Sequence, residues 1–203
     1  MSCFHIIGII LAAGAGRRMG GPKALLRFDD GTTLLERQTS LLIEGGCARV
    51  GIVIGAFAPE IRVSHPAIPA RWIINERWEM GQFTSLQAGI AGSLSTDAGG
   101  AMVLPVDVAG ISSDVVTAII DTALRNPHLD AVVPEYGGRG GHPVYLSRSF
   151  CTLLAGLDPA DSRSRLDTQL ALLANAIRIP VNNPNVAKNI NTQEEWETMK
   201  LSS

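Results

Sequence analysis

Glycines and cations are concentrated in one short stretch near the start of the chain. Residues 14–23 hold four glycines and three cations, the cations being Arg17, Arg18 and Lys23. Glycine lets a backbone approach a ligand closely, and arginine and lysine supply fixed positive charge for phosphate oxygens. The apolar run at residues 6–11, just before this stretch, is typical of a buried strand. A strand that leads into a glycine-rich, cationic loop predicts a binding site for a polyphosphate.

The spacing of this loop differs from two common phosphate-binding motifs. A P-loop requires serine or threonine directly after its lysine, whereas Lys23 is followed by alanine. Gly14, Gly16 and Gly20 have the spacing GxGxxxG, which is one residue longer than the dinucleotide-binding GxGxxG. The second predicted strand also ends without the acidic residue that would bind a ribose. A glycine turn with solvated cations remains the alternative to a phosphate site of another kind.

The composition sets the class of protein. The chain has 203 residues, of which 46% are hydrophobic and 18% charged, as expected of one globular α/β core. Its net charge of −2 argues against a general nucleic-acid partner, which needs a broad basic surface. The apolar run near the start is too short for a signal sequence or a membrane span. Cys3, Cys47 and Cys151 form no CxxC pair, so we expect reduced thiols and a cytoplasmic protein.

Strand and helix patterns alternate along the chain. Apolar runs predict strands at residues 6–11, 49–55, 71–74, 101–105, 130–134, 144–146 and 177–181. Apolar spacing and capping residues predict helices at residues 33–45, 82–94, 112–124, 147–156, 165–175 and 192–200. The alternation predicts a single α/β domain over residues 1–203, with a mostly parallel twisted sheet and helices on both faces. Ligands of such sheets bind at the carboxyl ends of the strands, where the glycine loop, residues 75–85 and Asp107 are expected to meet.

The stretch LAAGAGRRMGGPK at residues 11–23 resembles the nucleotide-binding signature LAAGxxxRMGxxK of the MobA-like nucleotidyltransferases. Four later stretches resemble blocks of the same family in the same order. They are an N-x-x-W…G…SL pattern at residues 75–86, a strand ending in Asp at 104–109, GRGGHPV at 138–144 and NINTQEE at 189–195. The resemblance runs from residue 6 to about residue 196, and it implies a nucleotide-diphospho-sugar-transferase-like, Rossmann-like fold.

Within that family the chain resembles the molybdenum cofactor cytidylyltransferases. Ala13 stands where the guanylyltransferase branch has glycine, and the GRxGHPV block favours the cytidylyl branch. The resemblance implies Mg²⁺-dependent transfer of CMP from CTP to the phosphate of a molybdopterin-type cofactor, with release of pyrophosphate; Mn²⁺ is the alternative ion. Guanylyl or other nucleotidyl transfer to a phosphorylated small molecule is the alternative reaction. A molybdoenzyme or a delivery protein would be the partner, with no nucleic acid and no membrane.

The same resemblance implies roles for individual residues. Lys23, Arg18 and Asp107 are the expected catalytic residues. Loop N–H groups, Arg18 and Lys23 would hold the triphosphate, while Asp107, with Asn191, would supply the hard oxygen ligands that suit Mg²⁺. The expected nucleotide-binding residues are Leu11, Ala12, Ala13, Gly14, Gly16, Arg18, Lys23, Asn75, Gly81, Ser85 and Asp107.

Some of these side chains have a simpler alternative role. Arg139 and His142 are expected to contact the acceptor, although Arg139 could equally be a surface residue and His142 a packed histidine in a tight turn. Asp107 could instead cap the helix that begins near Ser112. The sequence offers no convincing nucleophile–base pair, which agrees with a phosphate acceptor that is already ionised near neutral pH.

The chain departs from the cytidylyl pattern in three places. Ala109 replaces a proline, and residues 158–165 lack the glycines of the acceptor motif G-D-x-G-A-R. Asn189 and Asn191 replace two aspartates, so that Asn191 offers a metal a neutral oxygen instead of a charged one. These departures motivate a second hypothesis, a nucleotide-binding chaperone of cofactor maturation with weakened catalysis. A Rossmann-type oxidoreductase is a third hypothesis, ranked last because of the loop spacing.

Overall fold

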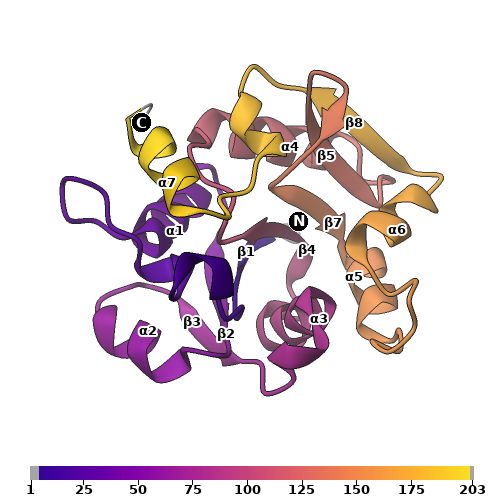
Figure 1. Ribbon diagram of the computed structural model, residues 1–203. Helices are drawn as coiled ribbons and strands as arrows, with labels where there is room; N and C mark the ends of the chain where they lie inside the picture. Colours follow the sequence, from indigo (N-terminus) through magenta and orange to yellow (C-terminus); the bar gives the residue numbers. More distant parts are fainter. Residues whose placement is uncertain (1–4, 202–203) are drawn as a thin grey trace.

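The strands form one mixed sheet whose central members run parallel (Figure 1). The computed structural model of the protein describes residues 5–201. The strands are β1 (His5–Ala12), β2 (Arg49–Ile54), β3 (Arg71–Ile74), β4 (Ala98–Pro105), β5 (Ala131–Tyr136), β6 (Arg139–Gly140), β7 (Val144–Ser147) and β8 (Ala176–Pro180). Their order is β3-β2-β1-β4-β7-β5-β6, and β8 pairs parallel to β5. The first four strands are parallel to one another, and β7 lies antiparallel between β4 and β5.

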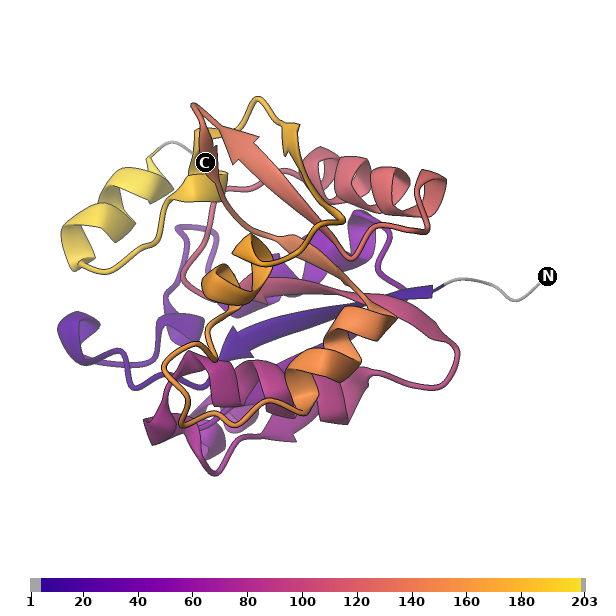
Figure 2. The ribbon, with the colours of Figure 1, turned by 90° about the vertical axis from the view of Figure 1, so that its right-hand side faces the viewer.

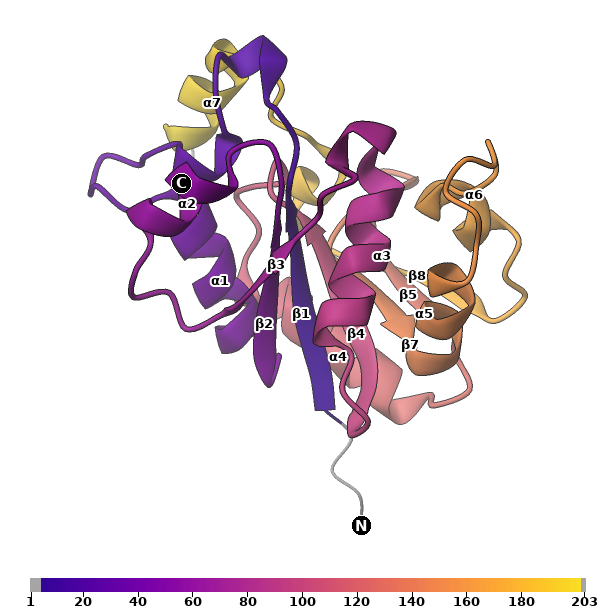
Figure 3. The ribbon, with the colours of Figure 1, turned by 90° about the horizontal axis from the view of Figure 1, so that it is seen from below.

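Helices cover both faces of this sheet (Figures 2 and 3). One face carries α1 (Leu34–Glu44), α2 (Ala58–Ser64), α4 (Ser113–Arg125) and α7 (Gln193–Lys200), whose buried side chains share one apolar core. The other face carries α3 (Gln82–Ser93), α5 (Arg148–Ala155) and α6 (Leu166–Ala171), which pack on a second core. The sheet is therefore buried on both sides, as its apolar strands require.

Local sequence signals explain where two of these helices begin and how closely one of them packs. Thr33 accepts a hydrogen bond from the Glu36 N–H while the Glu36 carboxylate accepts one from the Thr33 N–H, a capping box that starts α1. The same motif at Thr192 and Glu195 starts α7. Gly89 lets α3 lie close to the sheet, because a Cβ there would collide with Ile9. The two capping boxes fix where α1 and α7 begin, and Gly89 fixes how closely α3 packs on β1.

The predicted α/β fold with a mostly parallel sheet is confirmed, and the differences are local. The prediction missed α2, began β4 three residues late, and extended α6 beyond its end at Ala171. Cys47 and Cys151 are buried free thiols, and burial raises the pKa of each to about 12, whereas Cys3 lies outside the described residues. Over residues 5–201, every helix is too short or too polar to cross a membrane.

Candidate functional site

The glycine-rich loop leaves the sheet at the carboxyl end of β1. Gly16 (φ 55°) and Gly20 (φ 73°) adopt the left-handed conformation and flank a short 3-10 turn, Arg17–Met19. The Met19 N–H donates to the Gly16 carbonyl at 2.8 Å. A Cβ on Gly16 would collide with the backbone carbonyl of Gly21, so the loop can close on itself only with glycine at this position.

Lys23 connects this loop to the end of a second strand. It begins another 3-10 turn, Lys23–Leu25, which is anchored by the buried Ala24. Its Nζ lies 3.0 Å from Asp107 Oδ2 and 3.3 Å from Asn191 Oδ1. The side chains of Lys23 and Asp107 are only 14% and 21% exposed, so water screens their charges incompletely. The ion pair therefore fixes the loop to the turn that follows the carboxyl end of β4.

Asp107 and Asn191 reach the same point from distant parts of the chain. Asp107 follows β4, and its carbonyl accepts a hydrogen bond from the N–H of the buried Ile190 at 2.7 Å. Asn191 directly precedes the cap of α7, and its N–H donates to Glu195 Oε2 at 2.6 Å. Arg18 Nη2 donates to Asn191 Oδ1 at 3.0 Å, although 173 positions separate the two residues. Four side chains that the sequence singles out thus form one contact network.

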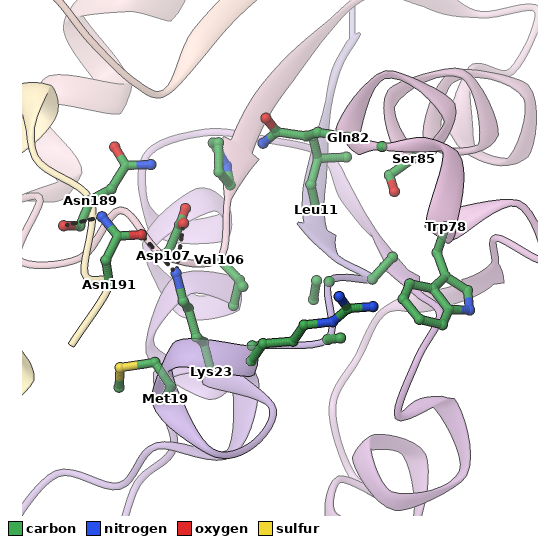
Figure 4. Close-up of a pocket in the computed structure, with 18 of the residues that line it drawn as sticks. Leu11, Met19, Lys23, Trp78, Gln82, Ser85, Val106, Asp107, Asn189 and Asn191 are labelled. Carbon is green, nitrogen blue, oxygen red and sulfur yellow. Dashed lines mark hydrogen bonds and ion pairs between the residues drawn. The ribbon is translucent and has the colours of Figure 1, made fainter. Parts of the chain in front are cut away.

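A cavity of about 560 Å³ lies between this network, the glycine loop and the start of α3 (Figure 4). Ten residues of the predicted nucleotide-binding set line it, together with Asn191. The ten are Leu11, Ala12, Ala13, Gly14, Gly16, Arg18, Lys23, Gly81, Ser85 and Asp107. The cavity carries the loop cations Arg18 and Lys23 and, in contact with Lys23, the Asp107 carboxylate, an arrangement suited to a phosphate chain with a bound cation.

Asn75 supports the cavity from a buried position instead of lining it. Its Nδ2 donates to Thr84 Oγ1 and Ser85 Oγ at 3.0 Å each, and its Oδ1 accepts from the Arg77 N–H. These bonds orient the first turn of α3, from which Ser85 reaches the cavity. The expected direct role of Asn75 in nucleotide binding stays a prediction, and in this structure its side chain supports Ser85.

The cavity wall also includes side chains that were not among the predicted catalytic, nucleotide-binding or metal-binding residues. They are Met19, Trp78, Glu79, Gln82, Val106 and Asn189. Trp78 packs tightly at the end of β2, because a Cβ on Gly55 would lie 2.7 Å from Trp78 Cβ. The signal in the sequence was the N-x-x-W…G…SL pattern at residues 75–86, within which Trp78 and Gln82 stand between the predicted site residues Asn75 and Ser85.

The two predicted acceptor residues lie outside the lining of this cavity, although His142 is close enough to Asp107 for its charge to act on the imidazole. Neither Arg139 nor His142 is among its lining residues in the described part of the chain. Arg139 is exposed on β6, paired in register with Tyr136. His142 is half-buried, and burial lowers its pKa to about 4 despite the opposing charge of Asp107. Both acceptor roles stay predictions.

The arginines in the charged segment near residues 158–167 are neutralised locally. Arg163 pairs with Asp161 at 2.8 Å, and Arg165 pairs with Asp167 at 2.8 Å. Hydrogen bonds from Arg163 lower the pKa of Asp161 to about 2. Because each arginine already has an acidic neighbour, an anionic acceptor gains less from this segment than from an unpaired cation.

The oxygens of Asp107 and Asn191 fit a divalent cation that shares its ligands with phosphate. One ammonium contacts both oxygens, so they already face a common point. Residues 5–201 hold no group of three or more His, Cys, Asp or Glu side chains placed to bind a metal. Mg²⁺ typically takes one or two protein oxygens and completes its shell with phosphate and water, and this donor set meets that requirement.

The chain is similar to several known proteins. Nicotine blue oxidoreductase from Paenarthrobacter nicotinovorans is 31% identical over 166 residues, covering 79% of this chain and 80% of that protein. Molybdenum cofactor cytidylyltransferase from Escherichia coli (strain K12) is 26% identical over 193 residues, covering 95% and 94%. The crystal structure of Rv0371c from Mycobacterium tuberculosis H37Rv in complex with manganese has the same fold. Its TM-score is 0.77 at 22% identity, with 98% of this chain and 100% of that chain covered.

The sequence model of the MobA-like NTP transferase domain matches residues 8–173, a span that includes the glycine loop, Lys23 and Asp107. The resemblance seen in the sequence motifs is thereby confirmed at the level of the family. This chain belongs to the MobA-like NTP transferase domain family.

Proposed function

We propose that this protein is a divalent-metal-dependent cytidylyltransferase of the cytoplasm, which transfers CMP from CTP to the phosphate of a molybdopterin-type acceptor. The observation that carries the proposal is the convergence of Arg18, Lys23, Asp107 and Asn191 beside the glycine loop. The similarity to a molybdenum cofactor cytidylyltransferase along 95% of the chain supports the cytidylyl branch. Ala13, which lines the cavity, supports the same branch.

The reaction exchanges one phosphorus–oxygen bond for another. An ionised oxygen of the acceptor phosphate attacks the α-phosphorus of the nucleotide. The bond from that phosphorus to the oxygen that bridges it to the β-phosphate breaks, and pyrophosphate leaves with the electron pair. A phosphate acceptor is already ionised near neutral pH, so the protein has no proton to remove. Its task is to position the reactants and to neutralise charge.

The chain's own residues are suited to that task. The glycine loop and Arg18 line the cavity where a triphosphate would lie, so that loop N–H groups and a guanidinium are available to its oxygens. Lys23 presents an ammonium at the edge of the same cavity, where it can neutralise the charge that develops on pyrophosphate. Mg²⁺ or Mn²⁺, held by Asp107 and Asn191, would supply further neutralisation of the phosphate oxygens. Because the same two oxygens hold the Lys23 ammonium, the ion and the ammonium compete for them.

Pyrophosphate release tests the proposal directly. The purified protein, Mg²⁺ and a molybdopterin acceptor are incubated with CTP, GTP, ATP or UTP in separate reactions. We expect release with CTP in preference to the other three nucleotides. A preference for GTP would contradict the cytidylyl assignment. Nucleotide binding by calorimetry, without pyrophosphate release for any phosphorylated acceptor, would indicate a chaperone of cofactor maturation.

An oxidoreductase is the second candidate, because the relative with 31% identity is named as one. That relative is more similar in sequence than the cytidylyltransferase but covers less of the chain. The two candidates differ in the ligand that the cavity would bind. Thermal protection by NADH or NADPH, but not by CTP with Mg²⁺, would favour the oxidoreductase. The reverse result would favour nucleotidyl transfer.

A further inference from the structure

The backbone that carries Asp107 is held by a buried side chain outside the cavity. Gln38 lies on α1 and is 2% exposed. Its Nε2 donates to the Val108 carbonyl at 2.7 Å and to the Val106 carbonyl at 3.0 Å, and lies 3.4 Å from the Pro105 carbonyl. Two of these acceptors immediately flank Asp107 in the sequence. The side-chain amide of Gln38 therefore hydrogen-bonds to the backbone on both sides of Asp107, the proposed metal ligand.

Backbone hydrogen bonds also hold the 105–108 turn. The Val106 N–H donates to the Leu11 carbonyl at 3.0 Å, and the Val108 N–H donates to the Pro105 carbonyl at 3.1 Å. The Asp107 carbonyl accepts from the Ile190 N–H at 2.7 Å. Gln38 supplies the donors for the remaining carbonyls of the turn, those of Val106 and Val108. In the protein interior an unpaired carbonyl would raise the free energy of the folded state.

One residue at the end of this turn departs from the family pattern. Ala109 stands where the family pattern has a proline, whose ring would fix one backbone dihedral. Ala109 is buried beside the carbonyls that Gln38 binds. The rigidity that a proline would provide within the turn is here supplied from α1.

We infer that Gln38 is a positioning residue for Asp107: it fixes the 105–108 backbone so that the carboxylate stays opposite Lys23 and Asn191. The inference rests on the proposed role of Asp107 as a metal ligand. Gln38 does not line the cavity that holds Asp107; it lines a second cavity of about 340 Å³ on the other side of the turn's Val108. Its effect on the reaction is exerted through the orientation of Asp107, in the way that outer-shell partners orient metal ligands.

The chain contains a matched control for this inference. Gln87 on α3 is 7% exposed, and its Nε2 donates to the Leu154 and Leu157 carbonyls at 3.1 and 2.8 Å, close to a third carbonyl at 3.4 Å. The Oε1 atoms of both glutamines are buried without a hydrogen-bond partner among the described residues. Both side chains are therefore buried and both donate to carbonyls of a distant segment, but Gln87 holds the end of α5 instead of the Asp107 turn.

The experiment compares Gln38→Met with Gln87→Met, since methionine keeps the length of the side chain and removes the donor. Hydrogen exchange is followed at the amides of Val106, Val108 and Ile190. In Gln38→Met we expect exchange at these amides to speed up about tenfold or more. Gln87→Met is expected to leave them unchanged and to speed exchange near residues 154–160. In the pyrophosphate assay, Gln38→Met should raise the apparent KM for Mg²⁺ about tenfold, with Gln87→Met within about twofold of the parent protein.

Unchanged exchange around Asp107 in Gln38→Met would overturn the inference, as would an equal effect of Gln87→Met on those amides. If Gln38→Met does not fold, Gln38→Asn takes its place, because it keeps an amide with a shorter reach. That variant should show the same exchange change to a smaller degree, and exchange like that of the parent would again overturn the inference. If the parent protein releases no pyrophosphate with any acceptor, the proposed function fails while the exchange measurement still tests Gln38.

Discussion

The ammonium of Lys23 lies 3.0 Å from the carboxylate of Asp107, across 84 positions of sequence. The contact joins the glycine loop after β1 to the turn after β4, and these are neighbouring parallel strands. Asn191 accepts a second bond from the same ammonium. A positive charge therefore already occupies the point at which a divalent cation would meet the protein, and ligand binding has to rearrange this contact.

Replacement of Lys23 separates its proposed catalytic role from its structural one. Lys23→Met should lower pyrophosphate release by about 10²–10³-fold, the usual cost of removing one group that stabilises transition-state charge. Mn²⁺ binding without nucleotide should tighten, because the competing ammonium is gone. Turnover is measured by pyrophosphate release and metal binding by electron paramagnetic resonance. The exposed Lys188 provides the control variant Lys188→Met, which should match the parent. Turnover at the parental rate in Lys23→Met would contradict the assigned role.

Asp107→Asn keeps the shape of the side chain and removes its charge. We expect pyrophosphate release to fall by about 100-fold or more, because the metal loses its carboxylate ligand. Circular dichroism should show an unchanged fold. Asp114→Asn, in the exposed first turn of α4, is the matched control and should keep its activity. If Asp107 only caps a helix, Asp107→Asn will keep its turnover, because asparagine caps helices about as well as aspartate.

Asn191→Asp adds a second negative charge beside Asp107. The apparent KM for Mg²⁺ should fall several-fold, because the number of charged ligands tunes the affinity for hard cations. Asn189→Asp serves for comparison, since Asn189 lines the same cavity from an exposed position, and its effect should be smaller. An unchanged KM for Mg²⁺ in Asn191→Asp would remove Asn191 from the set of metal ligands.

The glycine loop should tolerate a methyl group at one position and not at another. Gly16→Ala forces a left-handed residue against the Gly21 carbonyl and should destabilise the fold by about 1–3 kcal/mol. It should also raise the KM for the nucleotide. A Cβ on Gly14 meets open space, so Gly14→Ala should keep the parental melting temperature. Melting curves of the two variants give the comparison, and equal stability in both would show that the loop can reshape around Gly16.

His142 should make the protein less stable in acid. Burial lowers its pKa from 6.5 to about 4, so between these values the unfolded chain binds more protons than the folded one. The free energy of unfolding therefore decreases as the pH falls from 6.5 to 4. At about 1.4 kcal/mol per pKa unit, the loss is about 2–3 kcal/mol. Urea titrations at several pH values should show this decrease, and His142→Gln should reduce it. The exposed His128 offers the control His128→Gln, which should leave the pH dependence intact.

The elements with strong local signals could be predicted from the sequence. The Thr33–Glu36 capping box places the start of α1, and the apolar run before the glycine loop places β1. By contrast, α2 buries only Ile61 and begins around Pro59, so its apolar pattern is too weak to stand out. The early part of β4 contains Gly99 and Gly100, which are typical of a loop, but it pairs with β1 regardless. Tertiary pairing overrides local composition there.

Residues of the candidate site that belong to sequence motifs could be predicted. Residues whose role depends on contacts with distant parts of the chain could not. Lys23 and Asp107 stand in recognisable stretches, and the structure brings them together. Asn75 stands in such a stretch too, but it turns inward to bind Ser85. Gln38 reads as an ordinary polar position on an amphipathic helix, because its carbonyl partners lie 67 to 70 positions away.

The sequence separation of Lys23 and Asn191 has a consequence for the order in which the parts of the site are synthesised. The two residues are 168 positions apart, and a ribosome adds about 5–20 residues per second. The glycine loop therefore leaves the ribosome on the order of 10 s before the residue that completes its site has been synthesised. During translation the nascent chain has its phosphate-binding loop but lacks Asn191. The proposed catalytic site can therefore form only in chains in which the segment leading into α7 has already been made.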